Sequence, residues 1–273
     1  TPPSCAEFSR LTDSVKDIGG AIDQELRRTS TVSADEEKAM GAKVLKELPK
    51  LLGGQLRSTG PIVDYITTVA APLVAQAERT DIPYTFHYLE GAKDENALAL
   101  PGGHIIVTQP LLEQWTKNEA QLAIVLGHEI GHIEKRHPVA ILQYSRTLGI
   151  PDDELISQTA LTIAQKPYSS RQEEESDRIG AHLVHNANYS VYQGVALWEQ
   201  KIKASSSTQK SGGLLDLVLD EASNVLDSHP PAARRACVMK QHAAREQKRA
   251  PKSRVYVGQT NLRKRVAMQE QVW

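Results

Sequence analysis

Residues 123–134 read Ala-Ile-Val-Leu-Gly-His-Glu-Ile-Gly-His-Ile-Glu, and this stretch decides the fold. Side chains four residues apart lie one above the other on a helix, so His128 and His132 can present two imidazoles to one metal ion. Glu129 is offset from that ion but close enough to reach a water molecule bound to it. This His-Glu-x-x-His arrangement is typical of zinc-dependent peptidases, in which the glutamate is the general base.

The flanking residues predict a buried helix. Asn118 is a candidate N-cap with Gln121 as its capping-box partner. An apolar stripe at helical spacing follows, formed by Leu122, Val125, Leu126, Ile130 and Ile133. The alternative to a metal site is a pair of core histidines bonded to backbone, with the glutamate in a structural salt bridge. A metal ion would satisfy all three polar side chains at once, whereas buried polar groups without partners are costly.

Length and composition indicate an ordinary globular protein. The 273 residues are compatible with one elaborated domain, and abundant alanine, leucine and glutamine with few aromatic residues favour helix. No run of about 18 apolar residues occurs, so we predict no transmembrane helix. Because the chain starts at Thr1, we expect that an N-terminal segment such as a signal peptide has been removed.

The two cysteines, Cys5 and Cys237, lie near opposite ends of the chain. In an oxidising compartment they could form a disulfide, and in a reducing one they would be two ordinary thiols.

Positive charge is concentrated at the C-terminus. Residues 234–273 contain 11 Lys and Arg and 2 Asp and Glu, which gives a charge of +9. Because the net charge of the whole chain is −1, the rest of the chain carries −10. Such a segment could hold an anionic surface, such as lipid headgroups or nucleic acid. Alternatively, it is a solvated helical face that complements an acidic body.

Periodicity predicts a mainly helical chain with a small sheet. Residues 84–89 and 104–108 alternate and are rich in β-formers, and the turn-like residues 90–103 join them, so we expect about three strands. Residues 203–213 read as a low-complexity loop. Helices are expected over residues 33–52, 61–79 with a kink at Pro72, 110–115, 118–135, a segment after 138, 171–185, 192–203 and 214–226.

A catalytic zinc ion needs a third protein ligand, and the acidic candidates cluster in residues 170–180. Glu173, Glu174 and Glu175 would point about 100° apart on a helix, so at most one of them faces the metal. Asp177 shares a face with Glu173, which favours Glu173 as the ligand and Asp177 as an outer support for a ligand histidine. Glu174 is the second choice, and a solvated acidic patch is the alternative to both.

Four motifs together resemble peptidase family M48. They are the His128-Glu129-x-x-His132 motif, Ser170-Arg171-x-Glu173-x-x-x-Asp177-x-x-Gly180, His229-Pro230, and residues 96–108, Asn-Ala-Leu-Ala-Leu-Pro-Gly-Gly-His-Ile-Ile-Val-Thr. The resemblance covers residues 34–235. It implies an α+β, predominantly helical, zincin-like (gluzincin) fold with a small sheet next to the zinc helix.

The resemblance also implies roles for individual residues. His128, His132 and Glu173 would bind one Zn²⁺ per chain, and Glu129 would be the base. His229 would stabilise the oxyanion or occupy the fourth zinc position in a latent state. Residues 104–108 would be an edge strand that receives a polypeptide substrate as an added β-strand. The residues expected to bind substrate are Asn96, Gly103, His104, Ile105 and Ile106.

For the whole chain we expect an N-terminal arm (1–33), a catalytic domain (34–235) and a basic extension packed on that domain (236–273). The family's soluble periplasmic members are the nearer comparison, because membrane helices and tandem helical repeats are both missing. We therefore expect a monomer in the bacterial periplasm that does not bind nucleic acid, with peripheral or outer-membrane association left open.

Three functions fit these observations. The first is a zinc endopeptidase that cleaves unfolded or misassembled envelope proteins and is held latent by His229. The second is a latent zinc protein that acts mainly as a chaperone-like binding factor. The third is zinc-dependent hydrolysis of another bond.

Overall fold

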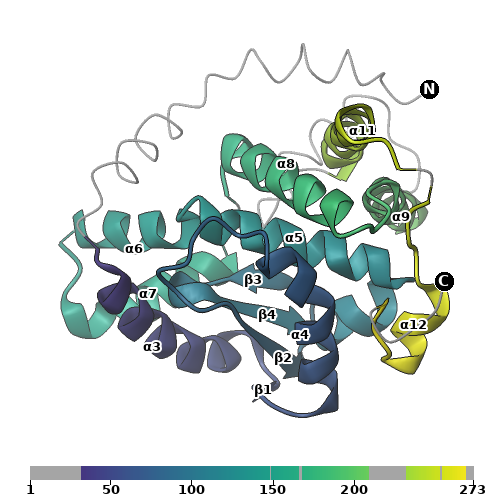
Figure 1. Ribbon diagram of the computed structural model, residues 1–273. Helices are drawn as coiled ribbons and strands as arrows, with labels where there is room; N and C mark the ends of the chain where they lie inside the picture. The colour runs from purple at the N-terminus through teal and green to yellow at the C-terminus, as the bar shows by residue number, and fades with distance from the viewer. Residues whose placement is uncertain (1–31, 148, 166–167, 209–231, 253, 269–273) are drawn as a thin grey trace.

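The computed structural model describes residues 32–147, 149–165, 168–208, 232–252 and 254–268. These residues form helices around a small mixed sheet (Figure 1), which confirms the predicted α+β, mainly helical class. The helices are α3 (Ala34–Leu52), α4 (Pro61–Val74), α5 (Glu119–Glu134), α6 (His137–Thr147), α7 (Asp152–Gln165), α8 (Ser170–Asn186), α9 (Tyr192–Thr208), α11 (Ala232–Arg249) and α12 (Gln259–Lys264). Two shorter helical turns are η1 (Pro101–Gly103) and η2 (Leu111–Trp115).

The sheet has four strands in the order β1-β2-β4-β3. They are β1 (Gln55–Arg57), β2 (Thr85–Glu90), β3 (Ala97–Ala99) and β4 (His104–Thr108). The long strands β2 and β4 are parallel, whereas β1 and β3 are short and pair antiparallel on the two sides. The sequence places β2 and β4 but neither β1 nor β3, because three residues carry too little periodicity to be recognised.

The prediction that residues 104–108 form an edge strand is wrong. β4 is an inner strand, with β2 on one side and β3 on the other. Residues 97–99, which read as part of a turn, pair with Ile105, Ile106 and Val107 and so form the outer strand at this end of the sheet. The backbone of Gly103, His104, Ile105 and Ile106 therefore does not lie at a free edge.

The two faces of the sheet pack against different helices (Figure 1). Phe86 and Ile105 point into the larger core, which α4 and α5 complete. Leu89 and Ile106 point to the opposite face, where residues of α3 and α7 cover them. The alternation along each strand thus places the helix with the two histidines against one face only.

The helix ends follow the sequence closely where caps exist. The side chain of Ser33 accepts from Glu36 N, and that of Asn118 accepts from Gln121 N, so α3 and α5 begin as predicted. α4 ends two residues after Pro72 and does not reach residue 79. The loop predicted from residue 203 is wrong as far as Thr208, because α9 continues there and no Gly or Pro stops it before Gly212.

Several predicted features lie outside the described residues. They are the arm over residues 1–31, the helix over 214–226, the rest of the loop (209–213), His229 and Cys5. Cys237, on α11, takes part in a disulfide. None of the described helices has the length and hydropathy that a membrane span requires.

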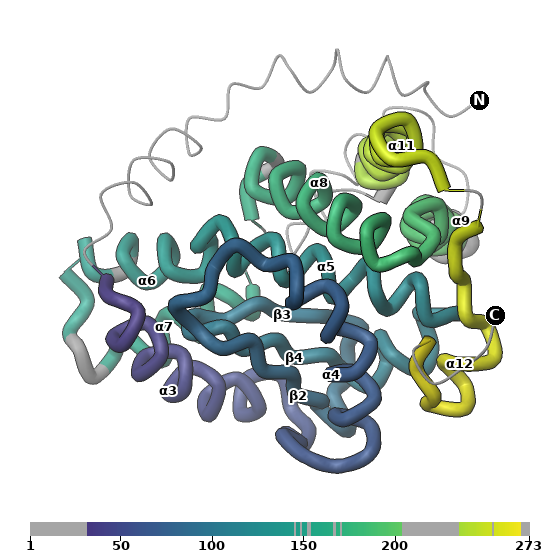
Figure 2. The backbone as a smooth tube through the Cα atoms, in the orientation of Figure 1, coloured from purple at the N-terminus to yellow at the C-terminus, as the bar shows by residue number. Residues whose placement is uncertain are grey.

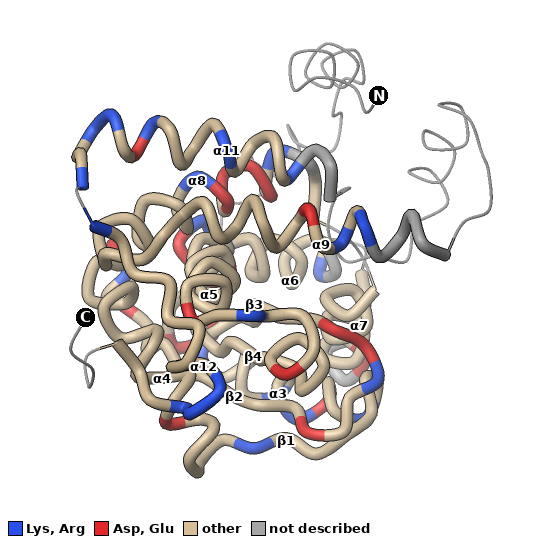
Figure 3. The backbone as a smooth tube through the Cα atoms, turned by 90° about the vertical axis from the view of Figure 1, so that its right-hand side faces the viewer, with Lys and Arg blue, Asp and Glu red and all other residues tan. Residues whose placement is uncertain are grey.

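The basic extension is built into the fold. α11 packs on α8 and α9, and the chain after it returns to the N-terminus of α5 (Figure 2). There Gly258 O accepts from Glu119 N, and the Glu119 side chain accepts from Met268 N. Lys and Arg residues lie along the whole of α11 and around α12 (Figure 3).

The close contact between α5 and α8 depends on glycines. A Cβ placed on Gly180 would lie 2.8 Å from the backbone N of His128, and one on Gly131 would lie 2.9 Å from Ser176 Cα. The two backbones therefore touch, which only glycine permits. This contact brings the first turns of α8 against the histidine-bearing half of α5.

We expect Gly180→Ala to destabilise the protein by about 1–3 kcal/mol, because the added methyl forces two backbones apart. It should also weaken zinc binding, since α8 carries Glu173. Gly194→Ala in α9 is the matched control, because its nearest neighbour is the flexible Met239 side chain. Urea unfolding and zinc titration of both variants test this. Equal stability and equal zinc affinity in the two variants would contradict it.

Candidate metal centre

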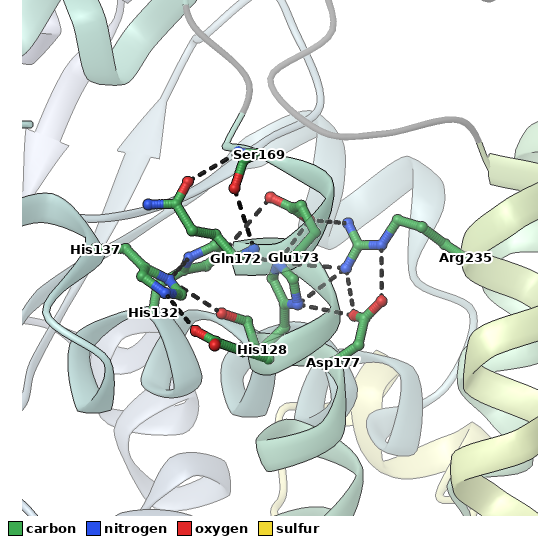
Figure 4. Close-up of polar contacts among 10 residues, drawn as sticks. His128, His132, His137, Ser169, Gln172, Glu173, Asp177 and Arg235 are labelled. Carbon is green, nitrogen blue, oxygen red and sulfur yellow. Dashed lines mark hydrogen bonds and ion pairs between the residues drawn. The ribbon is translucent and has the colours of Figure 1, made fainter. Parts of the chain in front are cut away.

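α5 and α8 together position three ionisable side chains in the interior. His128 and His132 lie four residues apart on one face of α5, and their Nε2 atoms are 3.0 Å apart. Glu173, in the first turn of α8, reaches both (Figure 4): its Oε2 lies 3.3 Å from His128 Nε2, and its Oε1 lies 3.5 Å from His132 Nε2. All three side chains are buried.

These three side chains fit a zinc ion. Zinc ligands at 2.0–2.2 Å in tetrahedral geometry are separated from each other by about 3.3–3.5 Å. The two Nε2 atoms are 3.0 Å apart, and each lies 3.3 or 3.5 Å from one of the two Glu173 carboxylate oxygens, which is close to that spacing. Among the described residues, no other group of three or more His, Cys, Asp or Glu side chains brings ligand atoms this close together.

Asp177 lies one turn after Glu173 and supports His128 from outside the triangle. Its Oδ1 is 2.9 Å from His128 Nδ1, so the imidazole can donate there and keep Nε2 free for a metal. This is the outer contact that the spacing of the two acidic residues predicts. Glu174 is exposed, and among the described residues it contributes no atom to the ligand triangle.

The sequence analysis missed Arg235, a buried cation beside the centre. Its Nη2 donates to Asp177 Oδ1 at 2.6 Å, and its Nη1 lies 3.2 Å from Glu173 Oε2. Its guanidinium stacks 4.0 Å from the ring centroid of Trp198 on α9. Nη2 is also 2.9 Å from His128 Nδ1, but two donors cannot bond to each other, so the Asp177 carboxylate takes both. Nothing local in the sequence marks Arg235, because it lies 58 residues after Asp177.

The charges of this cluster depend on one another. Burial alone would lower the pKa of His128, but the carboxylates of Glu173 and Asp177 outweigh it and raise that pKa to about 9. Burial holds the pKa of His132 well below its usual value. Burial opposes ionisation of Asp177, but Arg235 and His128 lower its pKa to about 2. Without a metal the cluster therefore holds a proton on His128, which a metal ion would have to displace.

A second outer support, also missed, stands behind His132. His132 Nδ1 and His137 Nδ1 are 2.7 Å apart, and His137 Nε2 lies 3.3 Å from Glu175 Oε2. With His132 Nε2 facing the metal, its Nδ1–H donates to His137, which in turn donates to Glu175. Tyr168 stacks on the His132 ring, with centroids 4.0 Å apart. A partner for His132 could have been expected on chemical grounds, because an imidazole that binds a metal through one nitrogen needs an acceptor at its second nitrogen.

A pocket opens beside His128 and Glu129. Asn96 and Ala97 lie at its β3 side, and Trp198 and Lys201 of α9 cover it together with Arg235. Its remaining lining residues are Glu95, Leu111, Ile124, Val125 and Leu197. Of the five residues expected to bind substrate, only Asn96 lines the pocket.

The other four expected substrate residues lie elsewhere. Ile105 belongs to the larger core and Ile106 to the core under α3 and α7. Gly103 ends the turn before β4, with Pro83 O 1.8 Å from where its Cβ would be, and His104 contacts β2. Their sequence resembled a substrate strand, but the chain uses them to build the inner strand of the sheet.

Comparison with known proteins agrees with this geometry. The sequence profile of peptidase family M48 matches residues 63–243, which is more than half of the chain. This chain belongs to peptidase family M48. The assignment makes zinc the expected metal and supports a metallopeptidase activity.

Individual M48 proteins share only low sequence identity with this chain. The mitochondrial metalloendopeptidase OMA1 of Schizosaccharomyces pombe is 29% identical over 196 residues, covering 68% of this chain and 58% of that protein. The beta-barrel assembly-enhancing protease of Yersinia pestis is 28% identical over 186 residues, covering 59% of this chain and 36% of its own. The Escherichia coli K12 protein of the same name is 23% identical over 208 residues, covering 67% and 39%. The chain thus spans less than two thirds of each of these relatives.

The outer supports predict how zinc affinity responds to mutation. We expect Asp177→Ala and His137→Phe each to weaken zinc binding about 10–100-fold, because each leaves a ligand histidine without its acceptor. Zinc titration against a competing chelator measures this. Glu174→Gln, an exposed carboxylate on the same helix, is the control. Unchanged affinity in both variants would show that the metal does not depend on these contacts.

Proposed function

We propose that the chain is a zinc-dependent metalloendopeptidase in which His128, His132 and Glu173 bind the metal. The observation that carries this proposal is the placement of Glu129. It lies next to His128 on α5, is buried, and lines the same pocket as the outer strand β3. The base Glu129, the metal ligand His128 and Ala97 of the outer strand thus line one pocket.

The reaction would be hydrolysis of a peptide bond. A bound zinc ion supplies Lewis-acid chemistry, which polarises the carbonyl and acidifies water. Glu129 takes the proton from the attacking water and delivers it to the leaving amine. Asp177 and His137 hold the ligand imidazoles in the required tautomers. His229 remains the candidate second catalytic group, as an oxyanion donor or a gate.

The substrate would bind as an added strand on β3 rather than on β4. Asn96 O accepts from Thr108 N, and Leu100 N donates to His104 O, so residues 96, 98 and 100 bond inward to β4. By the alternation of an antiparallel pair, the N–H and C=O groups of Ala97 and Ala99 point outward. These groups can pair with an extended polypeptide next to Glu129.

A latent resting state is part of this proposal. The three ligand side chains and Glu129 are all buried, and α9 and α11 cover the pocket through Trp198 and Arg235. A polypeptide can reach Glu129 only if part of this cover moves. The same enclosure favours the second candidate function, a zinc protein that acts mainly by binding misfolded proteins.

The relatives' names support a proposal on substrates and location. Two of the relatives are called beta-barrel assembly-enhancing proteases, so we propose unfolded or misassembled envelope proteins as substrates and the bacterial periplasm as the compartment. We propose that the protein works as a monomer. The basic residues of the extension would support peripheral contact with an anionic membrane.

We expect Glu129→Gln to keep the fold and the zinc but to abolish peptide cleavage, because it removes the base without removing a ligand. Casein digestion followed by mass spectrometry, with the zinc content measured in parallel, tests this in the full chain. His229→Ala run beside it reports latency: cleavage by this variant but not by the wild type identifies the histidine as a gate. Cleavage that persists in Glu129→Gln would refute the mechanism.

We expect Ala97→Pro to raise the KM for peptides or abolish their cleavage while zinc affinity stays unchanged. Proline removes the outward N–H of the edge strand and leaves pairing with β4 intact. Ala97→Val, which keeps that N–H, is the matched control. If peptide kinetics are equal in the proline and valine variants, substrate does not pair with β3.

A further inference from the structure

A second cluster of metal-binding side chains lies on the other face of the sheet. Thr85 and His87 on β2 and His104 on β4 share the face of Leu89 and Ile106, which belong to the core under α3 and α7. α5 packs against the opposite face. The cluster is therefore separate from the catalytic centre and takes no part in the proposed reaction.

Three ligand atoms converge in this cluster. His87 Nε2 lies 3.2 Å from His104 Nδ1. Thr85 Oγ1 lies 2.6 Å from His104 Nδ1 and 3.3 Å from His87 Nε2. The parallel register places Thr85 directly beside His104, and His87 follows two residues later on the same face. Two fixed neighbouring strands thus hold the three atoms in a small triangle.

The spacing of the two imidazoles matches that of the catalytic pair. The Nε2 atoms of His128 and His132 are 3.0 Å apart, against 3.2 Å for the nitrogens of His87 and His104. Tetrahedral zinc ligands at 2.0–2.1 Å would be about 3.3–3.4 Å apart, so neither imidazole pair needs more than a small adjustment. Thr85 Oγ1, which lies 2.6 Å from His104 Nδ1, would have to move away from that nitrogen to bind the same ion.

The protonation pattern also suits metal binding. Ser58, which follows β1, has its Oγ 2.8 Å from His87 Nδ1, so His87 can donate there and present the lone pair of Nε2 to the triangle.

We propose that His87, His104 and Thr85 form a second metal site for a borderline divalent transition-metal ion such as Zn²⁺. Two imidazoles and one hydroxyl favour zinc, copper or nickel over magnesium or calcium, which prefer oxygen ligands. His104 and Thr85 are only half-buried, so an ion can enter from solvent. Without a carboxylate among its three donors, this site binds zinc more weakly than the catalytic centre does.

The test is zinc stoichiometry in the full chain. Wild type, His87→Gln and His104→Gln are dialysed at buffered free zinc from nanomolar to micromolar, and bound metal is counted by mass spectrometry. His182→Gln is the control, because His182 is a partly exposed histidine on α8 that contacts Glu246 and belongs to neither cluster. His104 is half-buried, so its variant should fold even if His87→Gln does not.

We expect two zinc equivalents in the wild type and in His182→Gln, the second appearing at higher free zinc than the first. His104→Gln and His87→Gln should bind one equivalent over the same range. Crystals soaked in zinc should show an anomalous peak between β2 and β4. A single equivalent in the wild type would mean that the cluster is a hydrogen-bonded network only. A second equivalent that persists in both variants would place that ion elsewhere, and either result overturns the proposal.

Discussion

The backbones of α5 and α8 touch each other, and the rest of the site depends on this contact. Two imidazoles and a carboxylate are buried on opposite sides of this contact, and their separation is set by how closely the helices approach. Buried ionisable groups are costly unless a metal or a charge compensates them. The glycines therefore do more than pack two helices, because they fix the dimensions of the ligand triangle.

Arg235 extends this constraint to the helices that cover the pocket. Its guanidinium contacts Glu173 Oε2 and Asp177 Oδ1, the same oxygens that lie nearest His128, and its face stacks on Trp198. A movement of α11 would leave two buried carboxylates without their cation. The cover and the ligand geometry are thus electrostatically linked, because a movement of α11 would change both the access to Glu129 and the charge around Glu173.

Local patterns allowed much of the site to be predicted. Caps at Ser33 and Asn118, the i, i+4 histidines and the Glu173 and Asp177 spacing each depend on a few adjacent residues. Strand order could not be predicted in this way, because residues 97–99 have no periodicity of their own. They become the outer strand only by pairing with β4. Arg235 likewise comes to the site through the packing of α11 on α8 and α9, which no local pattern reports.

The contacts of Glu119 indicate that the basic extension is part of the folded domain. This carboxylate, at the first turn of α5, is fully buried and accepts from the hydroxyls of Tyr65 and Tyr189 and from Met268 N. Its last partner lies 149 residues later in the chain, beyond the end of the M48 match at residue 243. A buried carboxylate that lost a donor would be destabilised. The N-terminus of the helix that carries both histidines is therefore held in part by the extension, so the structural domain is longer than the family match.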